Sequence, residues 1–122
     1  MNILLFGHGK WGKILYKNLN NRYKVIKIFN SKSSIEDFDY KNIDWAIVAT
    51  DNFSHYQISN FLIKKKINVF CEKPLTTNYL QSKQLVNLSK KMGSKLFINH
   101  IYNFRKFNLK LSLNNTIKRS KI

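Results

Sequence analysis

Three glycines near the start of the chain have the spacing of a phosphate-binding turn. Residues 4–12 read LLFGHGKWG, so Gly7, Gly9 and Gly12 form the pattern G-x-G-x-x-G. In such a turn the first glycine bends the chain, the second lets the backbone approach a pyrophosphate, and the third lets a helix pack closely on a strand. The pattern alone is weak, because three glycines in six residues also occur in ordinary turns. Its meaning depends on the elements around it.

Further groups capable of acid-base chemistry follow later apolar runs. The stretches that carry them are VATDNFSH at 48–55, VFCEKPLT at 69–76 and INHIYNF at 98–104. Each places polar side chains directly after a run of β-branched and aromatic residues, which is typical of the end of a buried strand. In a parallel sheet such ends meet at one edge, where ligands bind. The three stretches therefore mark the ends of three predicted strands.

The elements that must position these groups alternate along the chain. We predict strands at 3–6, 25–29, 45–49, 69–71 and 96–98, and helices at 10–20, 53–65 and 78–92. The polar segment between the second and third strands has room for only a short strand or one helical turn. Parallel neighbours need crossover helices, so the alternation predicts an α/β fold with a doubly wound parallel sheet. The glycine turn then lies between the first strand and first helix, where free N–H groups and the helix dipole attract phosphate.

The strongest bulk feature is a net charge of +16, from 22 Lys and Arg against 6 Asp and Glu. Such a field attracts polyanions, so nucleic acid is a candidate partner. The basic residues are nearly all lysine and are spread along the chain, with one compact run at 64–66. A nucleic-acid module more typically clusters arginine with exposed aromatic residues. We therefore favour a solvated lysine-rich surface, and keep binding of RNA or another polyanion without redox activity as the alternative.

Length and composition indicate one cytoplasmic domain. The chain has 122 residues, 43% of them hydrophobic, and contains no apolar run long enough to span a membrane. Only Met1 and Asn2 precede the first apolar segment, which leaves no room for the charged start of a signal peptide. The single cysteine, Cys71, cannot form an internal disulfide and is most simply a buried strand residue. No Cys/His spacing predicts a metal site.

In combination, the motifs resemble a known family of oxidoreductases. The glycine turn, the Ala-Thr pair at 49–50 with His55 five residues after its threonine, and the Glu-Lys-Pro triplet at 72–74 are similar to the N-terminal domain of the glucose-fructose oxidoreductase, inositol 2-dehydrogenase and MocA family. The resemblance covers residues 1–113 and leaves 114–122 as a basic C-terminal tail. It implies a Rossmann-like NAD(P)-binding domain of an oxidoreductase acting on sugars, cyclitols or similar hydroxy compounds.

The resemblance also implies which residues hold the cofactor. In the family the lysine of the triplet, here Lys73, reaches both the nicotinamide ribose and the substrate hydroxyl, so it is the candidate catalytic residue. We expect its side chain to be partly buried at the strand end. His55 and His100 are weaker candidates for a direct role. A histidine at a helix start or a strand end is often only a polar residue whose hydrogen bonds are made within the protein. The candidate cofactor-binding residues are Gly7, Gly9, Lys10, Trp11, Gly12, Asn30, Ser31, Lys32, Thr50, Asn52, His55, Glu72, Lys73 and His100.

The end of the second strand predicts a preference for NADP over NAD. NAD-specific sites commonly place Asp or Glu there, about 20 residues after the glycines, to accept hydrogen bonds from the ribose 2′-OH. This chain has Asn30, Ser31 and Lys32 instead, whose amide, hydroxyl and ammonium groups can donate to a 2′-phosphate. The alternative is that Lys32 points into solvent.

The chain departs from the family pattern in three places. It has no counterpart of the C-terminal α+β substrate domain, so we expect a truncated or split member that needs a second polypeptide to supply that domain. The segment between Asn30 and Asp44 is shorter than usual, which predicts a shallow adenine side of the cleft. Lys66 stands where the family often has the glycine that ends a helix.

Overall fold

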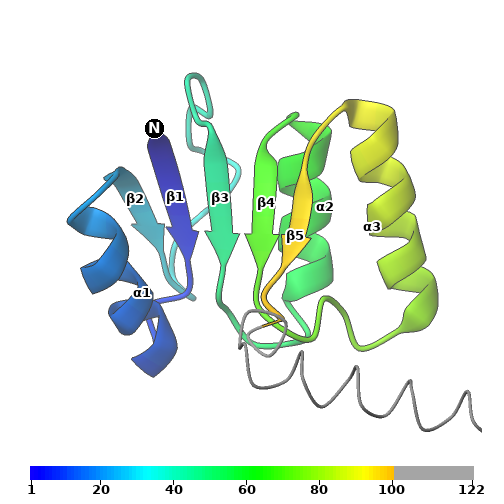
Figure 1. The fold of residues 1–122 in the computed structure, drawn as a ribbon, viewed down its shortest axis with the longest axis horizontal. Helices are drawn as coiled ribbons and strands as arrows, with labels where there is room; N and C mark the ends of the chain where they lie inside the picture. The colour runs from blue at the N-terminus through cyan, green and yellow to red at the C-terminus, as the bar shows by residue number, and fades with distance from the viewer. Residues whose placement is uncertain (101–122) are drawn as a thin grey trace, which may run out of the picture.

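The computed structural model describes residues 1–100 of the chain. The predicted domain boundary at 113, the tail at 114–122 and the last residues of the INHIYNF stretch lie outside the described residues. Within 1–100, strands and helices alternate as predicted (Figure 1). The elements are β1 (Asn2–Phe6), α1 (Lys10–Asn20), β2 (Lys24–Phe29), β3 (Trp45–Val48), α2 (His55–Lys64), β4 (Asn68–Cys71), α3 (Tyr79–Met92) and β5 (Leu96–Ile98).

The five strands form one parallel sheet with the order β2-β1-β3-β4-β5, which confirms the doubly wound α/β fold. All five arrowheads in Figure 1 point the same way, so the carboxyl ends of the strands lie along one edge. After β1 the chain adds β2 on one side, and it later adds β3 on the other side of β1. This reversal is the topological switch point at which open α/β sheets bind ligands.

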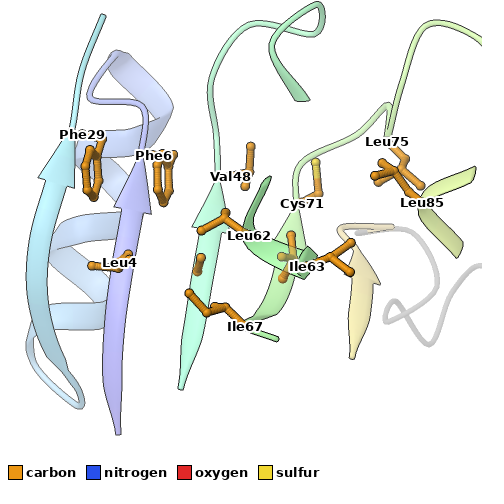
Figure 2. Close-up of a cluster of buried hydrophobic side chains, with 12 residues drawn as sticks. Leu4, Phe6, Phe29, Val48, Leu62, Ile63, Ile67, Cys71, Leu75 and Leu85 are labelled. Atoms are coloured by element: carbon orange, nitrogen blue, oxygen red, sulfur yellow. The ribbon is translucent and has the colours of Figure 1, made fainter. Parts of the chain in front are cut away.

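The two faces of the sheet carry separate apolar clusters. Successive strand residues point to opposite faces, so Leu4 and Phe6 face one way while Ile3 and Leu5 face the other. Leu4 and Phe6 belong to a core that includes side chains of α2 and α3, whereas Ile3 and Leu5 pack with side chains of α1. Figure 2 shows the larger core, in which the rings of Phe6 and Phe29 stack with centroids 4.4 Å apart. Helices on both faces thus fix the strand ends that carry the site.

The segment between β2 and β3 forms neither the short strand nor the helical turn that we predicted, and consists of turns and bends. Aromatic packing holds it instead. Phe38 meets Phe29 edge-on at 5.5 Å between ring centroids, and Tyr40 meets Phe61 of α2 at 5.4 Å. The hydroxyl of Tyr40 donates a hydrogen bond to the carbonyl of Ile35. Burial of side chains, which a polar sequence pattern does not reveal, orders this segment.

Helix ends differ from the prediction by one or two residues where side chains cap them. Helix α2 begins at His55 rather than Phe53, because the Asp51 carboxylate accepts the N–H groups of Phe53 and Ser54 and holds that stretch as a turn. Asn78 is the N-cap of α3 rather than its first residue, since its side chain accepts two N–H groups of the first turn. After α2, Lys66 has φ of 60°, the left-handed conformation that a glycine would adopt more easily.

Candidate functional site

The glycine turn connects β1 to α1 by backbone contacts that exclude side chains. Gly7 has φ of 101°, and a Cβ on it would lie 2.2 Å from the carbonyl oxygen of Ala49. A Cβ on Gly12 would lie 2.1 Å from the carbonyl oxygen of Gly7. The first glycine therefore packs against the end of β3, and the third lets α1 approach the turn. The positive φ of Gly7 fits the turn expected of the first glycine, and the contact at Gly12 fits the close packing expected of the third.

Gly9, the middle glycine, has a different environment. It is the N-cap of α1, and a Cβ on it would meet nothing within 4 Å. Its φ of −73° is accessible to any residue, so its own backbone does not require glycine. The first N–H groups of α1 have no partner within the helix, and its first turn carries no acidic residue. An open space above exposed backbone donors is what a pyrophosphate needs.

A groove of about 900 Å³ runs along this turn, between the ends of β2, β1 and β3 and the start of α2. It brings together eight of the residues that the sequence predicted for the cofactor: Gly7, Gly9, Lys10, Trp11, Gly12, Asn30, Ser31 and Thr50. It is also lined by Ala49, of the Ala-Thr pair that the sequence singled out, and by residues that sequence reasoning missed, namely Phe6, His8, Phe29, Ser33, Ile35, Asp51, Ser54, Gln57 and Ile58. Ser33 and Asp51 lie close in sequence to predicted residues, which was a usable signal. No sequence signal pointed to Ile35 and Ile58, because these residues meet only when α2 packs beside the segment after β2.

A smaller cavity of about 350 Å³ lies over the ends of β3 and β4. Its lining residues are Trp11, Ala49, Thr50, Asn52, His55, Glu72 and Lys73. Trp11, Ala49 and Thr50 also line the groove, so the two spaces adjoin at these residues. Together they extend across the switch point from β2 to β4.

Glu72 connects three segments at the boundary of the smaller cavity. Its side chain is nearly buried, and its Oε1 accepts hydrogen bonds from Trp11 Nε1 at 2.6 Å and from Asn99 Nδ2 at 2.7 Å. The donors come from the first turn of α1 and from the residue after β5. Sequence reasoning did not select Asn99, although its place directly after a strand was a signal. The carboxylate is therefore committed to holding other side chains.

His55 is buried, with 1% of its surface exposed. Its Nδ1 lies 2.7 Å from the carbonyl oxygen of Pro74, and its Nε2 lies 3.2 Å from that of Thr50. The ring thus ties the loop after β3 to the turn after β4. A neutral imidazole can donate to one of these oxygens, and an imidazolium can donate to both. Although His55 borders the smaller cavity, both ring nitrogens face backbone groups.

Three other predicted residues are solvent-exposed. The side chain of Lys73 is exposed, not partly buried as we expected, because β4 ends at Cys71 and Lys73 lies on the turn beyond it. It still lines the smaller cavity. Lys32 and His100 line neither cavity. Lys32 lies on a turn in which its N–H donates to Asn30 Oδ1 at 2.9 Å.

Two ionisable groups have shifted pKa values. Hydrogen bonds from Ser54, chiefly from its hydroxyl, lower the pKa of Asp51 in the groove. Burial raises the pKa of Cys71 to about 12, as expected of a thiol in the core under α2. Within residues 1–100, one ion pair, between Lys41 and Asp39 at 4.0 Å, meets the usual distance limit. Most of the basic charge of the described part therefore remains available to attract anions.

Metal and membrane features are not found in residues 1–100. No three His, Cys, Asp or Glu side chains of this part group together as metal ligands. None of its helices has the length and apolar character needed to cross a bilayer.

Comparison with known proteins identifies the family. Residues 17–100 match the family described as "Oxidoreductase family, NAD-binding Rossmann fold" (GFO_IDH_MocA). The chain belongs to this family. It is 32% identical over 88 residues to the 2,7-anhydro-N-acetylneuraminate hydratase of Escherichia coli K12, a match that covers 72% of this chain and 24% of the relative. The hydratase of the same name from Mediterraneibacter gnavus is 28% identical over 67 residues, covering 55% of this chain and 18% of the relative.

Solved structures share the fold. A probable dehydrogenase from Thermotoga maritima superposes with a TM-score of 0.78 at 23% identity, over 94% of this chain and 41% of that one. The WlbA dehydrogenase from Bordetella pertussis, in complex with NADH and UDP-GlcNAcA, has a TM-score of 0.74 at 20% identity, over 80% of this chain and 37% of that one. The UDP-N-acetylglucosamine 3-dehydrogenase GnnA from Acidithiobacillus ferrooxidans has a TM-score of 0.78 at 14% identity, over 93% and 43%. The chain thus spans less than half the length of these proteins.

Proposed function

We propose that this NAD-binding domain holds a dinucleotide across the groove and the smaller cavity, prefers NADP, and serves an oxidoreductase that acts on a sugar derivative. The observation that carries the proposal is the open space above Gly9, at the start of a helix whose first N–H groups are free. A pyrophosphate fits there because backbone donors and the helix dipole both favour negative charge.

The two halves of the dinucleotide then extend from the pyrophosphate in opposite directions. The adenosine ribose lies toward Asn30 and Ser31 at the end of β2, and the nicotinamide lies toward the smaller cavity at the ends of β3 and β4. When bound, the nicotinamide gives or accepts a hydride. Lys73, which is exposed at this cavity, donates hydrogen bonds to the nicotinamide ribose and to the reacting oxygen of the substrate. In the direction of reduction its ammonium gives that oxygen the proton that makes it a hydroxyl, and in the direction of oxidation its neutral amine takes the proton from the hydroxyl.

The preference for NADP follows from the turn after β2. Asn30 Oδ1 already accepts the Lys32 N–H, so the side-chain amide NH₂ is the group left to donate to a 2′-phosphate. Ser31 adds a hydroxyl to the groove wall. The ammonium of Lys32 reaches the phosphate by moving from its exposed position. One charge-assisted hydrogen bond contributes roughly 1.5 to 3 kcal/mol, which is a preference of about ten- to a hundredfold for NADPH over NADH.

The substrate class is supported by proteins with the same fold. Two structural neighbours are dehydrogenases whose descriptions name UDP-sugar compounds, and the curated relatives are named as hydratases of an anhydro-neuraminate. We propose that the surface binding the sugar comes from polypeptide outside these 122 residues, such as a second chain. The isolated 122-residue chain then binds cofactor but shows no turnover with sugars or cyclitols. Turnover by the pure chain that Lys73→Ala abolishes would place the complete active site within it.

The binding test compares two cofactors and two charge reversals. NADPH and NADH are titrated by calorimetry into the wild type, Lys32→Glu and the control Lys91→Glu, which makes the same charge change on the exposed surface of α3. We expect Lys32→Glu to remove the preference for NADPH and Lys91→Glu to keep it. Equal wild-type affinities that Lys32→Glu does not change would rule out the NADP preference.

The same titrations at two salt concentrations test the polyanion alternative. An RNA oligonucleotide is the third ligand, because phosphate-backbone binding falls steeply as salt increases. A wild-type protein that binds the oligonucleotide and neither dinucleotide would contradict the proposed function.

A further inference from the structure

The indole of Trp11 is held by a hydrogen-bond network with the buried Glu72 and the half-buried Asn99. Its Nε1 donates to Glu72 Oε1 at 2.6 Å, and Asn99 Nδ2 donates to the same oxygen at 2.7 Å. Glu72 is 9% exposed, so solvent competes little for this carboxylate. The orientation of the indole therefore depends on Glu72, and that of Glu72 depends on Asn99.

Trp11 also stands where the two cavities adjoin. It lines both the groove and the smaller cavity, and its side chain is 42% exposed. A half-exposed side chain without such a partner samples several rotamers. Asn99 lines neither cavity, so any effect it has on a ligand there must pass through Glu72 and Trp11.

We propose that Trp11, fixed by Glu72 and Asn99, is a positioning residue for the nicotinamide half of the dinucleotide, an inference that rests on the proposed function. A ligand whose pyrophosphate lies at the glycine turn must pass this ring to enter the smaller cavity. A ring fixed before binding loses no rotamer freedom when the ligand arrives. Releasing one side chain weakens binding by roughly three- to tenfold, and only for the part of the ligand that meets it.

The test uses two ligands that differ only by the nicotinamide: NADP⁺ and 2′-phospho-ADP-ribose. The variant Asn99→Leu removes one donor from Glu72 without altering a cavity-lining side chain, and Asn87→Leu makes the same chemical change on the exposed surface of α3. We expect Asn99→Leu to weaken NADP⁺ binding about three- to tenfold and to leave phospho-ADP-ribose unchanged. The control binds both ligands as the wild type does.

A spectroscopic measurement follows the ring itself. The chain has two tryptophans, so Trp45→Phe leaves Trp11 as the single emitter. In that background we expect Asn99→Leu to shorten the rotational correlation time of Trp11 in time-resolved anisotropy, because the ring is released. An unchanged anisotropy would overturn the proposed link between Asn99 and the indole.

The two-ligand outcomes separate the inference from the proposed function. If Asn99→Leu loses the same affinity for both ligands, the network supports only the fold. If it loses affinity for neither, the network does not position the ring. Either result would overturn the inference. If the wild type binds phospho-ADP-ribose as tightly as NADP⁺, the dinucleotide site would remain supported, but the positioning role of Trp11 would be overturned. A wild type that binds neither ligand would overturn the site and the inference together.

Discussion

Substituting the three glycines of the turn one at a time separates folding from cofactor binding. In Gly7→Ala the new Cβ would lie 2.2 Å from the Ala49 carbonyl oxygen at a φ of 101°. The left-handed backbone costs about 1–2 kcal/mol and overpacking about 1–3 kcal/mol, so we expect a loss of about 2–5 kcal/mol of unfolding free energy. Gly12→Ala gains helix propensity of up to about 1 kcal/mol but meets the Gly7 carbonyl at 2.1 Å, so its loss is smaller.

In contrast to Gly7→Ala, we expect Gly9→Val to affect cofactor affinity much more than stability. Nothing lies within 4 Å of its Cβ position, so the new side chain meets no clash, and we expect only the poorer N-cap residue to lower the unfolding free energy, by about 1 kcal/mol. The branched side chain fills the space proposed for the pyrophosphate and removes about two charge-assisted hydrogen bonds, roughly 3 kcal/mol or a hundredfold in affinity.

Chemical denaturation and NADPH titration of the same samples measure both effects. Gly93→Ala is the control: it places alanine at a φ of 72° after α3, away from both cavities, and lowers stability by about 1 kcal/mol without a change in affinity. Wild-type NADPH affinity in a folded Gly9→Val protein would refute the cofactor site, and wild-type stability in Gly7→Ala would refute the packing of the turn against β3.

Three further predictions concern stability and pH. Lys66→Gly relieves a left-handed residue at the end of α2 and raises the unfolding free energy by about 0.5–1 kcal/mol in urea denaturation, and an unchanged or lower value would contradict the strain at this position. Because burial raises the pKa of Cys71 to about 12, the native thiol resists a disulfide reagent at pH 8 and reacts on unfolding; stability falls as pH rises above about 8.5, where the unfolded thiol ionises and the folded one does not. Because hydrogen bonds from Ser54 lower the pKa of Asp51, this carboxylate stabilises the fold above about pH 4, and that stabilisation is lost as pH falls through the pKa of Asp51 in the folded protein. An NMR titration of Ser54→Ala that leaves the pKa of Asp51 unchanged would contradict this assignment.

Local patterns were enough to predict the elements and their topology. The apolar run before Gly7 and the helical spacing after it gave β1 and α1, and the same reasoning placed every strand and helix of residues 1–100 within one or two residues. These predictions succeeded because strand and helix periodicities are properties of neighbouring residues. The position of the glycine turn at the switch point followed, since a right-handed crossover leaves few arrangements for alternating strands and helices.

Tertiary structure decided what the side chains at the strand ends do. Trp11 and Glu72 are 61 residues apart in the chain and meet only because the carboxyl ends of β1 and β4 lie at one edge of the sheet. His55 is enclosed by the carbonyl groups of two different loops, and Lys73 is exposed because its strand ends two residues earlier. Burial and hydrogen-bond partners are properties of segments brought together in space, and spacing along the chain does not contain them.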